Sequence, residues 1–137
     1  MALQYCLLAY GDICDNLVSE LPEGESQDLA TLGLAQYFAA AVTMPYQRFL
    51  TMAADTRYDI DLLCNYFGTG FETTAQRLAT LQRPGLKGVP FSFIRTDRAG
   101  NISKRQSSTA FHFARSGGSC PLWVVHRAFD TPNRVTR

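Results

Sequence analysis

The chain has 137 residues, of which 46% are hydrophobic and 18% are charged, and its formal net charge is +1 at pH 7. A chain of this length forms one domain or part of one, and its apolar content excludes an intrinsically disordered protein. No apolar run reaches the ~18 residues of a transmembrane helix, and the first residues lack the basic start of a secretory signal.

The first 82 residues have the pattern of helices. Apolar residues recur at three- and four-residue spacing over residues 2–20, which predicts an amphipathic helix. Pro22 and Gly24 end it, and Ser26 is expected to be the N-cap of a second helix. Because the run 29–42 is rich in alanine and leucine and almost without charge, this second helix is expected to be buried on most sides.

Three shorter helices are expected before residue 83. Pro45 stops or kinks the second helix, because proline cannot continue the backbone hydrogen bonding. The expected helices cover 46–54, a segment that begins at Thr56 or Asp59 and ends at Gly68 and Gly70, and 72–82. Together these segments predict a helical bundle over residues 1–83.

In the next part of the chain, apolar and polar residues alternate instead of recurring with a helical period. Residues 89–96 are rich in β-forming side chains, and residues 101–107 can return beside them across the turn Asp97–Gly100. This spacing predicts a β-hairpin. The side chains expected on one face of the hairpin are Phe91, Phe93 and Arg95.

The C-terminal part predicts one more short element. Pro121 indicates the N-terminus of a short helix that runs towards Phe129. The predicted fold class is therefore α+β, with a helical bundle over 1–83 followed by a small antiparallel β-hairpin element and a short helix over 84–137. Since the sequence stops without a helix cap or a packed end, we expect the chain to be a fragment of a longer protein.

Residue types that carry catalysis or bind metals are scarce. His112 and His126 belong to no HExxH or paired cysteine–histidine pattern, and the chain has neither a GxSxG nor a GxxxxGK[ST] motif. We therefore expect no enzymatic activity, no catalytic residue and no zinc site. A structural role is favoured for His126.

The four cysteines are scattered without CxxC spacing; they are Cys6, Cys14, Cys64 and Cys120. This distribution favours reduced thiols in a cytoplasmic protein over disulfides. Cys120 follows a Gly-Gly-Ser loop at the expected N-terminus of a helix, where the dipole lowers the pKa of a thiol. It is a candidate for a reactive thiol or a metal or iron–sulfur ligand, and a small packed residue is the alternative.

Charge divides the chain into two unlike parts. Residues 1–82 carry ten acidic and three basic residues, whereas residues 83–137 carry two acidic and ten basic residues. Phenylalanines interleave with the basic residues, so the second part is expected to bind an anionic and partly apolar ligand. Nucleic acid is also anionic and partly apolar, so it is an alternative ligand for this part of the chain. A solvated face over a phenylalanine core, and neutralisation between the two parts, are the structural alternatives.

Five segments of the chain resemble one known family. They are LAQYFAAAVTMPY (34–46), RYDIDLL (57–63), RLATLQRPGLKGVPF (77–91), DRAGNISKRQS (97–107) and GGSCPLW (117–123). These segments are similar to the effector domain of short-chain fatty acyl transcriptional regulators (ScfR), which are Xre-type regulators of propionate and acetate metabolism in bacteria. The resemblance covers nearly the whole chain. It implies sensing of a short-chain acyl-coenzyme A, coupled to DNA binding through a helix-turn-helix that is absent from this chain.

The resemblance implies coenzyme A or an acyl-coenzyme A as ligand and, only in the full-length protein, an iron–sulfur cluster. We also expect a homodimer that makes no membrane contact. The cationic residues expected to hold the polar half of the ligand are Arg83, Lys87, Lys104, Arg105 and Arg115. The residues expected at its acyl or adenine end are Phe91, Phe93, Phe111 and Trp123.

The same regulators contain a region related to ImmA/IrrE metallopeptidases, which bind zinc through HExxH and a third acidic ligand. The resemblance places Leu3, Gln4 and Leu7 where the two histidines and the glutamate stand, and Gly33 or Leu34 where the third ligand stands. None of these side chains supplies what a catalytic zinc site requires. The alternative function is therefore a degenerate metallopeptidase-like domain that serves as a dimerisation platform, and an active hydrolase is the least favoured reading.

Overall fold

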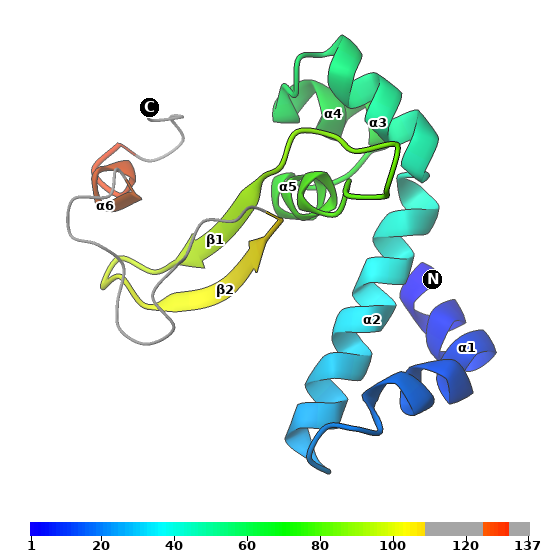
Figure 1. Cartoon of the computed structure of the whole chain (residues 1–137). Helices are drawn as coiled ribbons and strands as arrows, with labels where there is room; N and C mark the ends of the chain where they lie inside the picture. The colour runs from blue at the N-terminus through cyan, green and yellow to red at the C-terminus, as the bar shows by residue number, and fades with distance from the viewer. Residues whose placement is uncertain (109–124, 132–137) are drawn as a thin grey trace. The chain divides into compact units, whose positions relative to one another are not determined.

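The computed structural model describes residues 1–108 and 125–131 and divides the chain into two compact units, Met1–Arg77 and Leu78–Arg137. In these described residues, five helices precede a two-stranded antiparallel sheet and a short sixth helix (Figure 1). The predicted α+β class is confirmed. The division between the units comes a few residues before the boundary expected at residue 83. None of the described helices combines the length and the hydropathy of a membrane span.

The first unit begins with two helices that pack on each other, α1 (Ala2–Val18) and α2 (Glu25–Thr43). Helical geometry in α1 is interrupted at Tyr10, where φ is −131° and ψ is 18°. The helix predicted over residues 2–20 is thus confirmed as two helical segments joined by a kink. An apolar cluster holds α1 and α2 together; its members are Cys6, Cys14 and Ala35, with Leu3, Leu34 and Phe38 against them.

The N-terminus of α2 differs from the prediction. Gly24, not Ser26, is the N-cap, and its φ of +90° is a conformation that residues with a side chain rarely adopt. Helical geometry therefore starts at Glu25, one residue before the serine that the sequence pattern favoured. Glu25 and Asp28 lie in the first turn, where their negative charge stabilises the helix dipole.

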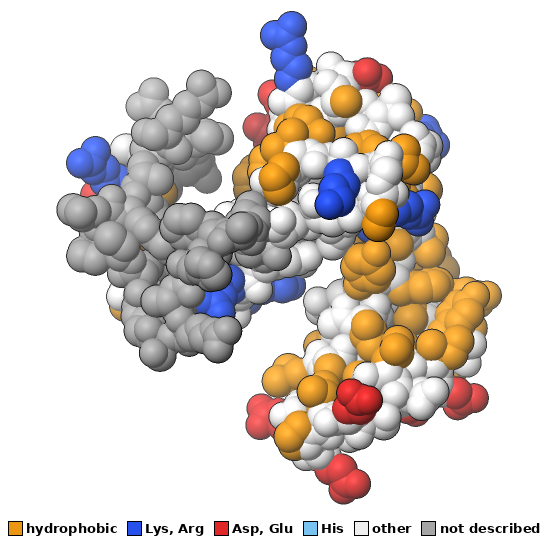
Figure 2. Space-filling view, in the orientation of Figure 1, with side chains coloured by type: hydrophobic (Ala, Val, Ile, Leu, Met, Phe, Trp, Pro, Cys, Tyr) orange, Lys and Arg blue, Asp and Glu red, His pale blue; other side chains and the backbone are white. Residues whose placement is uncertain are grey.

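The expectation that α2 is buried on most sides was wrong. Ala35 is its one buried residue, whereas Leu29, Leu32 and Val42 are 62%, 44% and 55% exposed. Figure 2 shows apolar side chains gathered on the surface over α1 and α2. The physical reason is that α2 packs mainly on α1, while Arg77 of α5 contacts it near its end, so much of the helix surface is left uncovered within its unit. A scarcity of charge predicts which residues could be buried, but burial itself requires a partner.

Three helices complete the first unit: α3 (Tyr46–Asp55), α4 (Ile60–Phe67) and α5 (Phe71–Ala79). The Asp59 carboxylate accepts a hydrogen bond from the Leu62 N–H at 3.0 Å, which confirms Asp59 as the N-cap of α4. Gly68 ends α4 in the left-handed conformation, as its position predicted. The helix expected over 72–82 ends at Ala79 instead.

Arg77 is the buried charged residue that joins α5 to the end of α2. Its Nε–H donates to the Met44 carbonyl at 3.1 Å, and its guanidinium lies over the rings of Tyr37 and Tyr46 at 5.7 and 5.9 Å. The Met44 carbonyl directly follows the last turn of α2, where unpaired carbonyls carry partial negative charge. A cation is therefore favourable at this position although it is buried.

We expect Arg77→Met to lower the free energy of unfolding by about 2–4 kcal/mol, because a charged hydrogen bond is lost and a buried carbonyl loses a donor. Urea denaturation followed by circular dichroism measures the change. Arg48→Met is the matched control, since Arg48 also contacts a tyrosine, Tyr66, but at the surface. Its effect should stay below about 1 kcal/mol. Equal midpoints for Arg77→Met and the parent would contradict the role assigned to Arg77.

The second unit opens with a tight loop and continues into a hairpin. The Gly88 N–H donates to the Leu81 carbonyl at 2.9 Å and closes a loop that contains Gly85 at φ +78°. The strands β1 (Ser92–Thr96) and β2 (Ile102–Ser107) follow, and α6 covers Val125–Ala128. Strand β1 starts later than predicted, since Pro90 has no N–H to donate to a strand ladder. The expected start of the short helix at Pro121 lies outside the described residues.

Candidate ligand-binding surface

The hairpin turn lies over Asp97–Gly100, as the sequence predicted, and Asp97 closes it. The Gly100 N–H donates to the Asp97 carbonyl at 3.0 Å, with Gly100 at φ +87°. The Asp97 carboxylate accepts hydrogen bonds from the Asn101 side-chain amide at 2.7 Å and the Asn101 N–H at 2.9 Å. These bonds, the side-chain one first, hold the pKa of Asp97 below its ordinary value. The turn therefore sets the register of the two strands through an ionised carboxylate.

We expect Asn101→Ala to raise the pKa of Asp97 towards its ordinary value, about 3.9. Because the folded-state pKa is depressed, the ionised carboxylate stabilises the hairpin above that pH, and the contribution is lost as the pH falls through the lowered pKa. An NMR titration of the Asp97 carboxyl in parent and variant measures the shift. In Asp97→Asn the side chain cannot ionise, so the stability of the hairpin should lose the pH dependence that the Asp97 carboxylate contributes. An Asp97 pKa that is the same with and without Asn101 would contradict this account.

One strand of the hairpin contains an extra residue. Arg95 pairs with Lys104 but Thr96 pairs with Ile102, so Ser103 is inserted as a β-bulge and lies opposite Arg95 together with Lys104. The Arg95 Nε–H donates to the Ser103 hydroxyl at 2.9 Å, and that hydroxyl donates to the Arg95 carbonyl at 3.3 Å. The bulge thus holds the Arg95 guanidinium at a defined position beside β2.

The register also decides which residues share a face. The pair Phe93–Gln106 comes two residues along from Arg95–Lys104, so these two pairs lie on one face of the hairpin. The pair that contains Arg105 lies on the opposite face, with Ile94. Neighbouring residues of a strand point to opposite sides, so Lys104 and Arg105 cannot both touch one small chemical group.

Two cations opposite each other are unfavourable unless an anion lies between them. Arg95 and Lys104 lie opposite each other, in a part of the chain whose acidic residues are Asp97 and Asp130 alone. Asp97 is engaged in the turn, and Asp130 lies 4.0 Å from the Arg98 guanidinium, with both side chains largely exposed. An exposed ion pair of this kind contributes little. Basic residues therefore greatly outnumber acidic residues in this part of the chain.

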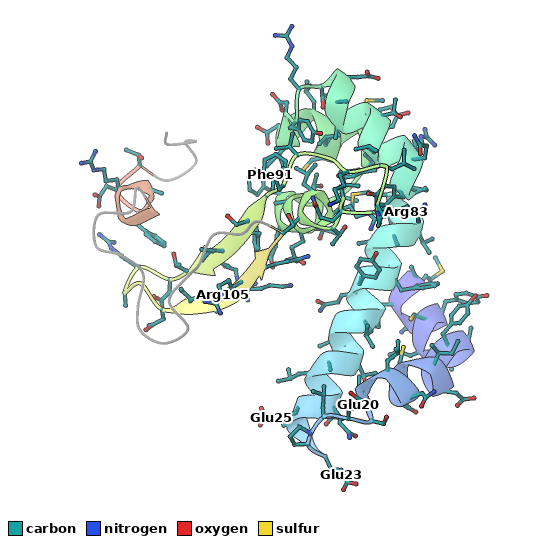
Figure 3. The ribbon with its side chains drawn as sticks, viewed as in Figure 1. Glu20, Glu23, Glu25, Arg83, Phe91 and Arg105 are labelled. Carbon is teal, nitrogen blue, oxygen red and sulfur yellow. The ribbon has the colours of Figure 1, made fainter. Side chains whose placement is uncertain are left out.

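The other predicted ligand residues are distributed more widely. Arg83 and Lys87 are exposed on the loop after α5, and half-buried Phe91 precedes β1. Figure 3 shows Arg83, Phe91 and Arg105 at separate places along the unit. Outside the described residues lie Phe111, Arg115, Cys120 and Trp123.

The structure brings together Phe93, Arg95, Ser103 and Lys104, and two of these were not among the ligand residues predicted from sequence. The period-two spacing of Arg95 with Phe93 was a signal for its inclusion. The sequence does not indicate this β-bulge, so Ser103 could be identified only from the pairing of the strands.

Two of the positions where the family resemblance expects zinc ligands are occupied by leucines, Leu3 and Leu34. Leu3 and Leu34 pack against the buried thiols of Cys6 and Cys14. Burial raises the pKa of the Cys6 thiol, and its hydrogen bond with Cys14 raises it further, so the thiol stays protonated. Within residues 1–108 and 125–131, no three histidine, cysteine or acidic side chains gather as a metal site. These residues do not fit a catalytic zinc ion.

Two family models match the chain, one over each part. Residues 3–79 match the IrrE N-terminal-like domain, and residues 80–137 match the C-terminal region of short-chain fatty acyl coenzyme A regulators. A solved structure of a Mycobacterium tuberculosis transcriptional regulator superposes with a TM-score of 0.90 and 55% identity, over 97% of this chain and 41% of that chain.

Curated relatives match the chain from end to end. The HTH-type transcriptional regulators PrpR and RamB of Mycobacterium tuberculosis are 54% and 50% identical to it, over 100% and 98% of this chain. The propionyl-CoA carboxylase regulator of Cereibacter sphaeroides is 51% identical over 98%. The chain spans 29%, 29% and 30% of the length of these three relatives.

Proposed function

Because this chain belongs to the short-chain fatty acyl coenzyme A regulators, with an IrrE N-terminal-like domain as its first part, we propose that it is the effector-sensing region of a transcriptional regulator. It binds a short-chain acyl-coenzyme A and does not transform it. The relatives are themselves transcriptional regulators, and one is a propionyl-CoA carboxylase regulator. DNA contact is assigned to another part of the longer protein.

The observation that carries this proposal is the Arg95–Lys104 pair beside Phe93 on one face of the hairpin. An acyl-coenzyme A presents phosphates, an aromatic base and an apolar acyl chain. Guanidinium and ammonium groups bind phosphate, and a phenylalanine ring provides surface for a base or an acyl group. Binding without turnover is supported by Leu3 and Leu34, which are apolar at two positions where the resemblance expects zinc ligands. The loop cations Arg83 and Lys87 are further candidates for contact with a ligand of this length.

Isothermal titration of the chain with acetyl-coenzyme A, propionyl-coenzyme A and free coenzyme A tests the proposal. We expect saturable binding of at least one, with affinity that decreases as salt is added because the phosphate contacts are electrostatic. Lys104→Gln should weaken binding by about tenfold, the usual cost of one charged hydrogen bond. If none of the three compounds produces heat or shifts the NMR signals of the hairpin, the proposal is wrong.

We also propose a second role for the first unit, association with a second copy of the chain. Leu8, Leu17 and Leu29 are 88%, 66% and 62% exposed on α1 and α2, which Figure 2 shows as an apolar surface. No charged residue occurs from 29 to 47. In a twofold interface the same surface of both copies is in contact, so a charged residue would face the same charge on the second copy. An uncharged helix face avoids this repulsion.

Light scattering at increasing protein concentration measures this association. We expect the mass of a dimer for the parent chain and of a monomer for Leu29→Glu combined with Leu32→Glu, because burying two carboxylates is costly. Leu62→Glu is the control, since Leu62 is 53% exposed on α4, away from α1 and α2 in the chain. A parent chain that stays monomeric at high concentration would exclude this role.

A further inference from the structure

We propose that a second copy of the chain packs its own α2 on the uncharged face of α2, with the two helices antiparallel. The inference rests on the proposed association of two copies, and it adds which helix forms the contact and in which direction the second helix runs. The residues that carry it lie on α2 and in the first turn of α3, within the first unit.

One side of α2 is left open after α1 has packed on the helix. Leu34, Ala35 and Phe38 belong to the apolar cluster between the two helices, so they mark the covered side of α2. The opposite side has residues at three- and four-residue spacing, which share one face of a helix. These residues are Leu29, Gly33, Gln36, Ala40 and Thr43. Ala40 is half-buried and the other four are exposed, so a continuous uncharged stripe is available to a partner.

Gly33 marks the point where a partner helix can come closest. A glycine inside a helix lowers its stability relative to alanine. The conformation of the chain does not require this glycine, because its φ is not positive. Packing within the chain does not require it either, since a Cβ at this position would meet no atom of another part of the chain within 4 Å. Close approach of a backbone from a second molecule gives the glycine a use.

The charges at the two ends of α2 set the direction of the second helix. Residues 29–47 are uncharged, and the first charged residue after them is Arg48, in the first turn of α3. The charged residues just before this run are all acidic; they are Glu20, Glu23, Glu25 and Asp28. Figure 3 shows Glu20, Glu23 and Glu25 gathered around the turn between α1 and α2. Parallel helices would place these carboxylates beside their own copies, whereas antiparallel helices place them towards the basic end.

Arg48 is accessible for such a contact. Its side chain is exposed, and its guanidinium donates to the Tyr66 hydroxyl at 2.8 and 3.3 Å. A tyrosine hydroxyl is neutral at pH 7, and the guanidinium has five N–H donors. Arg48 can therefore keep its contact with Tyr66 and also attract a carboxylate of the second copy.

One register of the antiparallel helices satisfies charge, size and polarity together. When Glu25 is level with Arg48 of the second copy, Gly33 is level with Ala40 of the second copy, so the small residues meet where the backbones are closest. The same register places Gln36 of both copies near the twofold axis. There each amide can donate to the other and accept from it, which removes the cost of burying a polar side chain.

Cross-linking of the full chain tests the direction of the helices. Ser26→Cys and Gln47→Cys introduce thiols at exposed positions close to the two ends of α2. After subunit exchange, a short bismaleimide should link a mixture of the two variants and leave each variant by itself at the level of the parent chain, which measures cross-linking through the native cysteines. Cross-linking of Ser26→Cys alone to the extent of the mixture would overturn the antiparallel direction.

Gly33→Leu tests the face. The added side chain meets no other part of the chain, so the midpoint of thermal unfolding should not fall. The dissociation constant of the dimer, measured by analytical ultracentrifugation, should rise by about tenfold or more, because an overpacked contact is destabilised. Ala54→Leu, which enlarges an exposed small residue of α3, is the matched control and should leave the constant unchanged.

The outcomes separate this inference from the role on which it rests. Equal dissociation constants for Gly33→Leu and the parent would overturn the assignment to this face of α2, while the association of two copies would stand. An equal rise in Ala54→Leu would also overturn it. A parent chain that is monomeric at high concentration would instead contradict the association itself.

Discussion

One extra residue in β2 determines what the second unit can present to a ligand. Without Ser103 the two strands would pair in regular register, and Arg95 would face a single residue. With it, Arg95 lies opposite both Ser103 and Lys104, and the serine hydroxyl holds the guanidinium. The bulge and the turn at Asp97 act together, because the turn sets the register from which the bulge departs. A short hairpin, which is marginally stable by itself, gains a defined cationic position in this way.

The first unit is held together by side-chain packing and by one buried charge. An apolar contact joins α1 and α2, with Leu3 and Leu34 packed on two buried thiols. The end of α2 is held instead by Arg77, whose charge is compensated by a carbonyl and two aromatic rings. Ordinary side-chain packing and a compensated buried charge thus supply the cohesion of this unit.

Much of the fold could be predicted from residue spacing. The segments of α1, α3 and α4 follow from apolar period and from end signals, since Asp59 caps a helix and Gly68 ends one through local backbone geometry. The N-cap of α2 was misassigned because a glycine at positive φ competes with a serine two residues later, and the pattern does not show which one wins. Burial of α2 was misjudged because composition does not reveal how many neighbours a helix has.

By itself the sequence determined the class of elements, the separation of charge between the two parts, the absence of zinc-binding residue types at the expected positions, and the family resemblance. These properties depend on local chemistry and on residue identity. Tertiary structure alone decided which cations share a face. Lys104 and Arg105 are adjacent in the chain yet lie on opposite sides of the hairpin, and Arg95 is joined to Ser103 across it. Strand register controls this outcome, because a shift of one residue reverses the face of every side chain.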